Sequence, residues 1–479
     1  MKAAIGLVIA LAACTTSNPA TPDGPGSACT PGRFDWATGG GGPGQGDAVT
    51  GVALDVDGSV WIAGTFIGDA TWGAISLSAS DTVHATGFVA KLDATGKVLL
   101  ARALPNATAA TRIRLDDAGN AYVVGSFETS LDLDGVHLVE NDDGNGAAFV
   151  IALDGTTGTA MFGAQSTTGT DGVVANDVAI DGAGDVYVIG QYNGHAVFDT
   201  ITVAGTSSDK AVFVAKYGHT AGAWAWAKGW AGSPDGTNDG GVGTALALDG
   251  AGNLYVTGQI AGTTDIDGTV LNADSGSFVA KLATATGTVA WTGEIVPSTT
   301  GGDRDYAAGA AVDSAGALYI TGSFKGSPMF TGTGAAITAS TVGGNVDMFV
   351  AKYSATGAPV WVQDAGNADT GETRGDDIAS DGTDVYVSGF RQGDTVFGGD
   401  TLADSSSMFV AKYDATGAVV WTKSASETGN DEAEASGLSV ASPTSGVAVG
   451  GSFGEMTTFG ATTLTDSGEG DAFVTAMCN

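Results

Sequence analysis

Met408-Phe-Val-Ala-Lys-Tyr-Asp-Ala-Thr-Gly-Ala-Val-Val-Trp421 is the stretch that decides the fold. It is typical of two short strands joined by a tight Thr-Gly turn, because β-prone residues flank the glycine on both sides. The Phe-Val-Ala-Lys pattern, or a close variant of it, occurs seven times at intervals of 60 to 71 residues. The phenylalanines of the seven copies are Phe88, Phe149, Phe213, Phe278, Phe349, Phe409 and Phe473. Repetition at a nearly constant period indicates a repeat architecture.

Each repeat contains four strand-like pieces. The first is a short apolar run that ends in Asp, as in Ala245–Asp249, and the second is a β-prone run such as Leu-Tyr-Val-Thr-Gly at 254–258. The third is Phe-Val-Ala-Lys, and the fourth ends in Gly-x-x-x-Trp. A flat sheet of 28 strands would far exceed normal sheet sizes. The pattern therefore predicts an all-β fold, a single seven-bladed β-propeller of four-stranded antiparallel blades.

The two ends of the repeat region complement each other. The last repeat stops after Phe473-Val-Thr-Ala-Met477 and lacks its Gly-x-x-x-Trp strand, whereas Gly32-Arg-Phe-Asp-Trp36 supplies that pattern before the first repeat begins. We expect the N-terminal strand, about residues 32–38, to complete the last blade and close the ring, which would remove the open sheet edge. The propeller is predicted to span 32–478.

The N-terminus has the pattern of a lipoprotein signal. One lysine precedes about ten apolar residues that end in Leu11-Ala-Ala-Cys14, a run too short to span a bilayer. This ending resembles a bacterial lipobox, which implies cleavage after residue 13 and acylation of Cys14. The alternative is an ordinary secretory signal with an incidental cysteine. We expect 1–13 to be the signal peptide, 14–31 a flexible tether, and the protein to be lipid-anchored at the outer membrane, facing the periplasm or the cell surface.

The chain has two further cysteines, Cys29 and Cys478, which flank the predicted seam of the ring. In an oxidising compartment we expect them to form a disulfide. Such a bridge would stabilise the fold by about 4–5 kcal/mol in the chain-entropy model, less any native strain. The alternative is two unrelated thiols.

Charge limits the classes of partner. Lys and Arg number 18 against 53 Asp and Glu, a net charge of -35. Nucleic acids and anionic membrane surfaces require basic patches, so we expect no nucleic-acid partner and contact with the membrane only through the lipid anchor.

The repeat wording Asp-x-x-Gly-Asn-x-Tyr-Val-x-Gly, then Phe-Val-Ala-Lys, then Gly-x-x-x-Trp, resembles the SBBP seven-bladed β-propeller repeat family over about residues 32–478. The resemblance implies a secreted or surface protein without an assigned reaction. The segment from Ala411 to Trp421 also resembles the tryptophan-docking repeat of quinoprotein dehydrogenases, which is itself structural and holds blade to blade. Those enzymes resemble eight-bladed rings with added metal and quinone ligands, and the repeats show neither, so we expect no cofactor of that kind.

Long loops between consecutive repeats carry carboxylates that propeller geometry would gather at the mouth of the central channel. Several converging carboxylates are suited to bind Ca²⁺ or a cationic ligand, although an acidic chain has acidic loops in any case. The candidates are Asp47, Asp171, Asp239, Asp303, Asp305, Glu372, Asp431 and Glu432. The turns that begin at Asp55 and Asp116 lack a full calcium-ligand series, so we expect them to be hairpin turns.

Five lysines share one repeat position: Lys91, Lys216, Lys281, Lys352 and Lys412. We expect each to pair with a repeated carboxylate, such as the Asp that ends the first strand; a ligand-binding ring is the alternative.

The sequence offers no catalytic motif. The four histidines occupy non-equivalent repeat positions, and there is no nucleophile elbow or phosphate loop. The sequence favours a non-catalytic scaffold that binds a protein, a glycan or another envelope component through its loops. The alternatives are a propeller hydrolase or lyase that uses channel-mouth carboxylates, and a calcium-binding surface protein. An enzyme should show one asymmetric pocket with unlike residues from several blades, whereas a scaffold should look nearly seven-fold.

Overall fold

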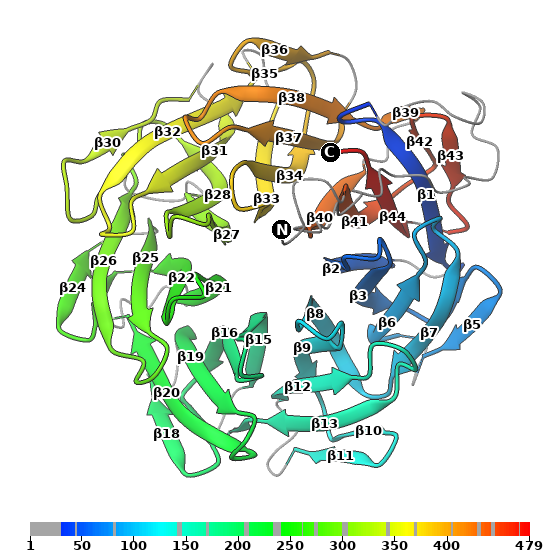
Figure 1. Ribbon diagram of the computed structural model, residues 1–479, viewed down its shortest axis with the longest axis horizontal. Coiled ribbons are helices and arrows are strands. Elements are labelled where there is room, and N and C mark those ends of the chain that lie inside the picture. Colours follow the sequence, from blue (N-terminus) through cyan, green and yellow to red (C-terminus); the bar gives the residue numbers. More distant parts are fainter. Residues whose placement is uncertain are drawn as a thin grey trace, which may run out of the picture.

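In the computed structural model, strands are arranged radially around a central channel (Figure 1). The structure describes residues 30–479 apart from 44–45, 80–82, 141–145, 169–171, 206–209, 233–240, 261, 273–275, 299–304, 342–344, 368–370, 404–405, 429–432, 442–445 and 469. Over these residues the core strands form seven four-stranded antiparallel sheets, numbered here as blades 1 to 7 in the chain order of their inner strands. The prediction of an all-β propeller with four-stranded antiparallel blades is confirmed.

The four strands of a blade run from the channel to the outer rim. The inner strands are β2 (Ala48–Leu54), β8 (Ala107–Leu115), β15 (Val173–Ile180), β21 (Val242–Leu248), β27 (Tyr306–Val312), β33 (Thr373–Ser380) and β40 (Glu434–Val440). The second strands are β3 (Val60–Phe66), β9 (Ala121–Phe127), β16 (Val186–Asn193), β22 (Asn253–Ile260), β28 (Leu318–Lys325), β34 (Val385–Arg391) and β41 (Val447–Phe453). The third strands are β6 (Thr86–Leu92), β12 (Ala147–Leu153), β19 (Lys210–Gly218), β25 (Gly276–Ala283), β31 (Val346–Tyr353), β37 (Ser407–Tyr413) and β44 (Asp471–Met477). The outer strands are β7 (Val98–Leu104), β13 (Ala160–Gln165), β20 (Ala223–Ala231), β26 (Val289–Val296), β32 (Pro359–Gly366), β38 (Val419–Ser424) and β1 (Phe34–Gly41).

The N-terminal strand pairs with the C-terminal strand. β1 lies antiparallel to β44, with Phe34 opposite Met477 and Gly40 opposite Ala472. The Gly32 amide donates to the Cys478 carbonyl at 2.8 Å, and the Cys478 amide donates to the Arg33 carbonyl at 2.9 Å. In blade 7 the third and outer strands are therefore joined by hydrogen bonds between the N-terminal and C-terminal segments. In every other blade a covalent turn joins these two strands.

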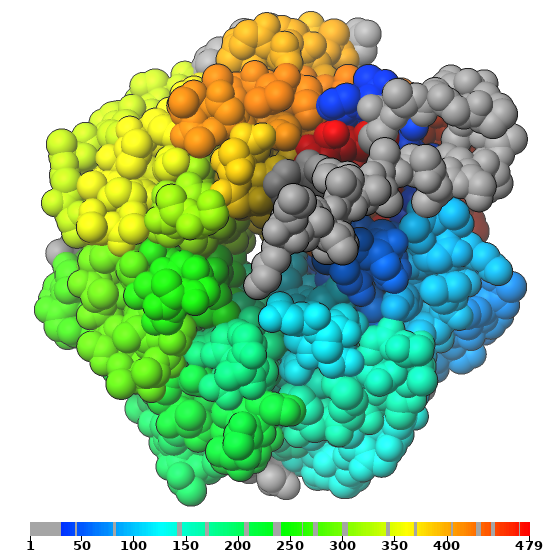
Figure 2. All heavy atoms as spheres, viewed as in Figure 1, coloured from blue at the N-terminus to red at the C-terminus, as the bar shows by residue number. Residues whose placement is uncertain are grey.

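The expectation of four strand pieces per repeat was incomplete. A short hairpin lies between the second and third strands of every blade and contacts strands at the outer rim of the ring. These hairpins are β4 (Asp69–Trp72) with β5 (Ile75–Ser78), β10 (Ser130–Leu133) with β11 (Val136–Val139), β17 (His195–Phe198) with β18 (Ile201–Ala204), β23 (Thr263–Ile266) with β24 (Thr269–Asn272), β29 (Met329–Phe330) with β30 (Ile337–Thr338), β35 (Thr395–Phe397) with β36 (Asp400–Leu402), and β42 (Met456–Phe459) with β43 (Thr462–Thr465). Two short strands, β14 (Thr167–Thr168) and β39 (Ser426–Thr428), pair with β17 and β42. Figure 2 shows the blades as adjoining lobes around the ring.

The glycine that ends the repeated Tyr-Val-x-Gly run is explained by a bulge in the inner strand. In blade 1 the register between β2 and β3 shifts between Val49 and Gly51. A Cβ on Gly64 would lie 2.0 Å from the Ala48 carbonyl oxygen, and the equivalent glycine of every other blade meets the same obstacle at 1.8 to 2.1 Å. Only glycine allows this close approach of two backbones. The bulge also re-aims the next residues of the inner strand.

Candidate functional site in the central channel

Three charged side chains from three blades meet inside the channel. Arg112 on β8, Asp177 on β15 and Asp377 on β33 all follow the bulge of their inner strand directly. Blades 1, 4, 5 and 7 have small residues at this register position: Gly51, Ala245, Gly309 and Gly437. These small residues leave room for one long side chain to cross the channel.

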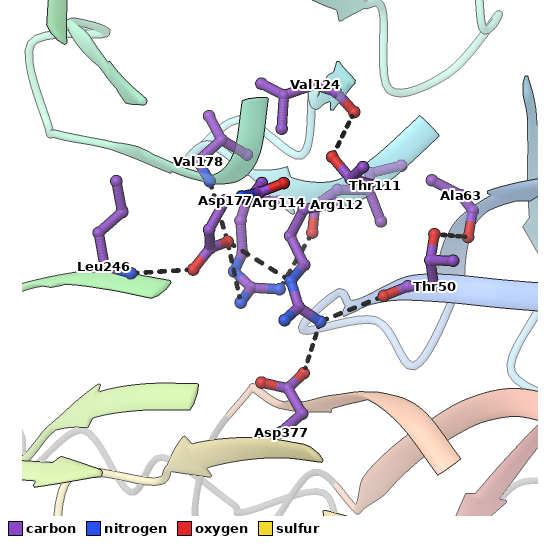
Figure 3. A network of polar contacts seen from close by, with 12 residues as sticks. Thr50, Ala63, Thr111, Arg112, Arg114, Val124, Asp177, Val178, Leu246 and Asp377 are labelled. Atoms are coloured by element: carbon purple, nitrogen blue, oxygen red, sulfur yellow. Dashed lines mark hydrogen bonds and ion pairs between the residues drawn. The ribbon is translucent and has the colours of Figure 1, made fainter. Parts of the chain in front are cut away.

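The Arg112 guanidinium spans the channel (Figure 3). Its Nη1 lies 3.1 Å from Asp377 Oδ2, and its Nε lies 3.6 Å from Asp177 Oδ1. Nη1 also lies within hydrogen-bonding distance of the carbonyl oxygens of Thr50, at 3.1 Å, and Ser436, at 3.2 Å. Burial lowers the pKa of Arg112, but the carboxylates of Asp377, Asp177 and Asp376 outweigh it and raise the pKa above its ordinary value. The arginine therefore remains charged.

Both aspartates are also held by main-chain amides. Asp177 accepts hydrogen bonds from the amides of Val178 at 2.9 Å and Leu246 at 3.1 Å. Asp377 accepts from the amides of Ile378 at 2.9 Å and Leu438 at 2.8 Å. Arg112, Asp177 and Asp377, called here the Arg112 layer, are nearly inaccessible to solvent. A buried charge set of this kind is stable only when its members are paired and hydrogen-bonded. All three side chains here are paired and make hydrogen bonds, although Arg112 Nε makes none to the described residues.

A second group lies on the inner strands of blades 5 to 7, nearer the starts of those strands. Tyr306, Arg374 and Glu434 share one register position on β27, β33 and β40. Arg374 donates to Glu434 Oε1 at 2.9 Å and to Glu372 Oε1 at 3.3 Å. The same position in blades 1 to 4 holds Ala48, Ala109, Val174 and Val242. At this register position, charged and aromatic side chains are thus confined to blades 5 to 7.

Asp376 completes this group, which is called here the blade 5–7 cluster: Tyr306, Glu372, Arg374, Asp376 and Glu434. Among the described residues, none donates a hydrogen bond to the buried Oδ2 of Asp376. Burial raises the pKa of this carboxyl well above its usual range, and the Glu434 carboxylate adds to the shift while Arg374 opposes it. Burial and then Asp376 raise the pKa of Tyr306. The protonated form of Asp376 is therefore favoured by its surroundings, and it lies next to a phenol and a guanidinium.

Of the predicted loop carboxylates, Asp171, Asp239, Asp303, Asp431 and Glu432 lie outside the described residues. Asp47 is buried and accepts hydrogen bonds from the amides of Gly42 and Ile67, at 2.8 and 3.0 Å. Asp305, its equivalent in blade 5, is also buried and accepts from the Lys325 amide at 2.7 Å. These two carboxylates fasten the loops to the ends of the second strands. Glu372 is the one that joins the blade 5–7 cluster.

Within the part of the chain that the structure describes, no three His, Cys, Asp or Glu side chains are grouped so as to hold a metal ion. The expected turn function of the Asp-containing segments is confirmed. Asp116, for example, accepts from the amides of Ala118 and Asn120, and Gly119 has a φ of 80°. Calcium binding by the full set of loop carboxylates stays a prediction.

The repeated lysines link neighbouring elements. Lys352 pairs with Asp313, the residue that ends the first strand of its repeat, at 3.5 Å, so the expected pairing is confirmed there. Lys216 and Lys412 instead pair with Asp185 and Asp384, which lie later in the turn. Lys91 and Lys281 donate to main-chain oxygens of the next blade, Gly155 at 2.6 Å and Ala355 at 3.1 Å. Each of the five also lies over an aromatic ring of the second strand, 4.7 to 5.5 Å from its centroid.

The predicted lipidation site Cys14 and the predicted disulfide partner Cys29 lie outside the described residues. Both assignments therefore stay predictions, as does the signal peptide. None of the described residues belongs to a helix long and apolar enough to cross a membrane.

No known family model matches this chain. No curated protein matches it in sequence. Several solved structures align with it at low identity. The quinohemoprotein alcohol dehydrogenase of Comamonas testosteroni is 11% identical, with 92% of this chain and 76% of that chain covered and a TM-score of 0.42. The polysaccharide lyase Uly1 is 11% identical, with 98% and 94% covered and a TM-score of 0.41. The β-propeller domain of the trilobed protease from Pyrococcus furiosus is 8% identical, with 92% and 98% covered and a TM-score of 0.40.

Proposed function

We propose that this chain is a lipid-anchored outer-membrane protein that binds a polar ligand at the blade 5–7 cluster. The single observation that carries the proposal is the asymmetry of the channel. Three adjacent blades contribute Tyr306, Arg374 and Glu434 at a position where the other four have Ala or Val. A channel with a purely structural role has no need of unlike side chains on one side.

The chemistry of the cluster favours a ligand with an amino group and hydroxyls. Its carboxylates outnumber its one guanidinium, and the whole chain carries a net charge of -35, so the mouth attracts cations. The phenol of Tyr306 and the carboxyls supply hydrogen-bond partners for hydroxyls. An amine-bearing glycan of the envelope combines both features.

Surface plasmon resonance on the chain from residue 29 onward tests this proposal with chitosan oligosaccharides and their N-acetylated counterparts. We expect binding of the amine form that weakens with salt and drops at least tenfold in Glu434→Gln. Glu128→Gln, an exposed residue of blade 2, is the matched control and should bind as the parent does. Equal binding of both oligosaccharides, or no binding of either, would overturn the proposal.

A catalytic role is the second candidate, because the channel meets the criterion of one asymmetric site with unlike residues from several blades. In a hydrolase or lyase, Asp376 would donate the proton, given its raised pKa. Incubation with acidic and amine-bearing polysaccharides should then release new reducing or unsaturated ends. Asp376→Asn should abolish this release and retain binding; release that persists in the variant would exclude Asp376 as the acid.

We further propose that the protein in solution is a single seven-bladed ring closed by β1 and locked by a Cys29–Cys478 disulfide. The pairing of β1 with β44 and the burial of Cys478 support this. Peptide mapping without reduction should recover the Cys29 and Cys478 peptides joined, and labelling with palmitate should mark Cys14. Recovery of two separate alkylated thiols would contradict the disulfide.

We also propose that the loops at the channel mouth bind calcium. Titration with calcium should raise the melting temperature and slow amide exchange in the loops that contain Asp239, Asp303 and Asp431. If both stay constant, the loops bind no calcium.

A further inference from the structure

The other half of the channel, on the far side of the Arg112 layer, contains a cavity of about 250 Å³. It is lined by inner-strand residues of blades 2 to 7 that lie beyond the layer in register, toward the ends of those strands. Most residues of the wall are Ala, Val, Leu or Ile, and their main-chain groups line the cavity together with their side chains. The Arg112 layer precedes these residues on the inner strands of blades 2, 3 and 6.

Arg114 is the one charged side chain among the described residues of this wall. The residues at the same register position in the other blades are small: Ala53, Ala179, Ala247, Ala311, Ala379 and Ser439. The small residues leave the cavity open, and one blade places a guanidinium in its wall. A wall with a purely structural role would have no reason for this exception.

The Arg114 guanidinium has more N–H donors than its contacts use. Its Nη1 donates to the Ile113 carbonyl at 3.2 Å, and its Nη2 lies 3.5 Å from Asp177 Oδ1, an oxygen that Arg112 shares. A guanidinium has five N–H donors, and this side chain is 27% exposed. Arg114 lines the cavity, and its two contacts leave several of these donors without an acceptor among the described residues.

The two other polar side chains of the wall, Ser380 and Ser439, can donate as well. The Ser439 hydroxyl accepts from the Leu54 amide at 3.0 Å, and the Ser380 hydroxyl accepts from the Gly382 amide at 3.0 Å. Each hydroxyl keeps its own hydrogen to donate. No carboxylate of the described residues lines the cavity. The wall thus complements an acceptor-rich anion with an apolar body.

We propose that this cavity binds a small monocarboxylate, with its carboxylate on Arg114 and its apolar part against the aliphatic wall. The volume is below the roughly 300–1,000 Å³ that drug-sized ligands need. At ~30 Å³ for a water-sized group, it accommodates about eight heavy atoms. A six-carbon aliphatic acid has this size.

Isothermal titration with hexanoate, hexylammonium and hexan-1-ol tests the charge preference. Hexanoate should bind, hexan-1-ol should bind at least tenfold more weakly, and hexylammonium should not bind. Binding of hexylammonium or hexan-1-ol as strong as that of hexanoate, or no binding of hexanoate, would overturn the proposal.

Two variants test the location. Arg114→Met removes the charge and keeps much of the stem, and Ala247→Leu fills the cavity; each should weaken hexanoate binding at least tenfold. Arg102→Met is the matched control, because Arg102 pairs with Asp134 away from the channel and its loss should leave binding unchanged. Circular dichroism and the melting temperature establish that each variant is folded. Hexanoate affinity that is unchanged in both folded test variants would place binding elsewhere and sink the proposal.

Discussion

Arg112 is a single side chain that contacts four other blades from its place on blade 2. It reaches Asp177 on blade 3, Asp377 on blade 6, and main-chain oxygens on blades 1 and 7. Removal of one partner from a buried charge set leaves the other charges unpaired, which costs more than the set contributes as a whole.

Arg112→Met should therefore lower the free energy of unfolding by about 3–5 kcal/mol, because it leaves the buried Asp377 without a cation and Asp177 with Arg114 alone. Urea denaturation measures the change. The triple variant Arg112→Met, Asp177→Asn, Asp377→Asn should recover most of the loss, since no buried charge remains. A single variant as stable as the parent would contradict this account of the layer.

The buried carboxyl of Asp47 makes the stability of the folded protein depend on pH. Burial raises its pKa to about 6; the amides of Ile67 and Gly42 oppose the shift, and Asp471 adds to it. A carboxyl whose pKa is higher in the folded state favours the folded protein when protonated. Its contribution is fully present below about pH 4 and is lost as the pH rises through about 6.

The stability of the parent relative to Asp47→Asn should accordingly fall between pH 4.5 and pH 7.5, as measured by urea unfolding at both values. The difference between the parent and Glu128→Gln should stay constant over the same range. A parallel pH response in the parent and Asp47→Asn would show that another group is responsible.

The channel residues show why the sequence did not reveal the site. Arg112, Asp177 and Asp377 each begin a short run that ends in Asp, and their contacts cross the ring between repeats. A signal was present: when the seven inner strands are aligned, one arginine and two aspartates share a column that is otherwise Gly or Ala. Charges in a column of small residues indicate that side chains meet in space, but only the ring shows which blades face each other.

At the scale of elements, neighbouring blades are joined by a tryptophan that lies over a glycine turn. Trp291 on β26 donates to the Ala355 carbonyl of the next blade at 3.3 Å, and a Cβ on Gly357 would lie 2.5 Å from its indole. The pairs Trp36–Gly96, Trp226–Gly287 and Trp361–Gly417 repeat this arrangement. Trp421 lies against Gly32, so the N-terminal segment supplies the turn for blade 7. The structural interpretation of the Thr-Gly-x-x-x-Trp repeat is confirmed.

Trp291→Ala should destabilise the protein by about 3–5 kcal/mol in urea unfolding, because it empties a half-buried contact between two blades. Trp291→Leu should cost less, since Leu100 meets Gly158 at the equivalent place between blades 1 and 2. Val360→Ala, at a side chain that is 49% exposed, should change stability by no more than about 0.5 kcal/mol. Equal losses for Ala and Leu at position 291 would show that the contact has another origin.

The rim hairpins are the elements that sequence reasoning missed. Their strands have two to four residues, too few for a clear alternation of apolar and polar side chains. The turn chemistry was the available signal: Asp134-Gly135 and Asp267-Gly268 both adopt positive φ values, as tight two-residue hairpin turns require. These hairpins account for part of the long interval between consecutive Phe-Val-Ala-Lys copies.

At the scale of the whole molecule, β1 joins the N-terminal and C-terminal parts of the propeller. If β1 closes the ring, a chain that begins at residue 42 exposes an unpaired edge of β44, and an unpaired edge invites pairing with another copy. Such a chain should be cleaved faster by protease and should dimerise or aggregate in light scattering. A chain that begins at residue 29 keeps β1 and should remain monomeric and resistant. Equal resistance of both chains would show that β1 is dispensable.

The Arg112 layer also determines how anything can travel through this protein. Because the ion pair between Arg112 of blade 2 and Asp377 of blade 6 crosses the channel between its two mouths, we expect a ligand to leave by the mouth through which it entered. A polymer cannot be threaded through the ring from one face to the other. Only a terminus, a branch or a protruding group of a polymer can bind inside the channel. A long partner would therefore bind at single points and dissociate without sliding along the protein.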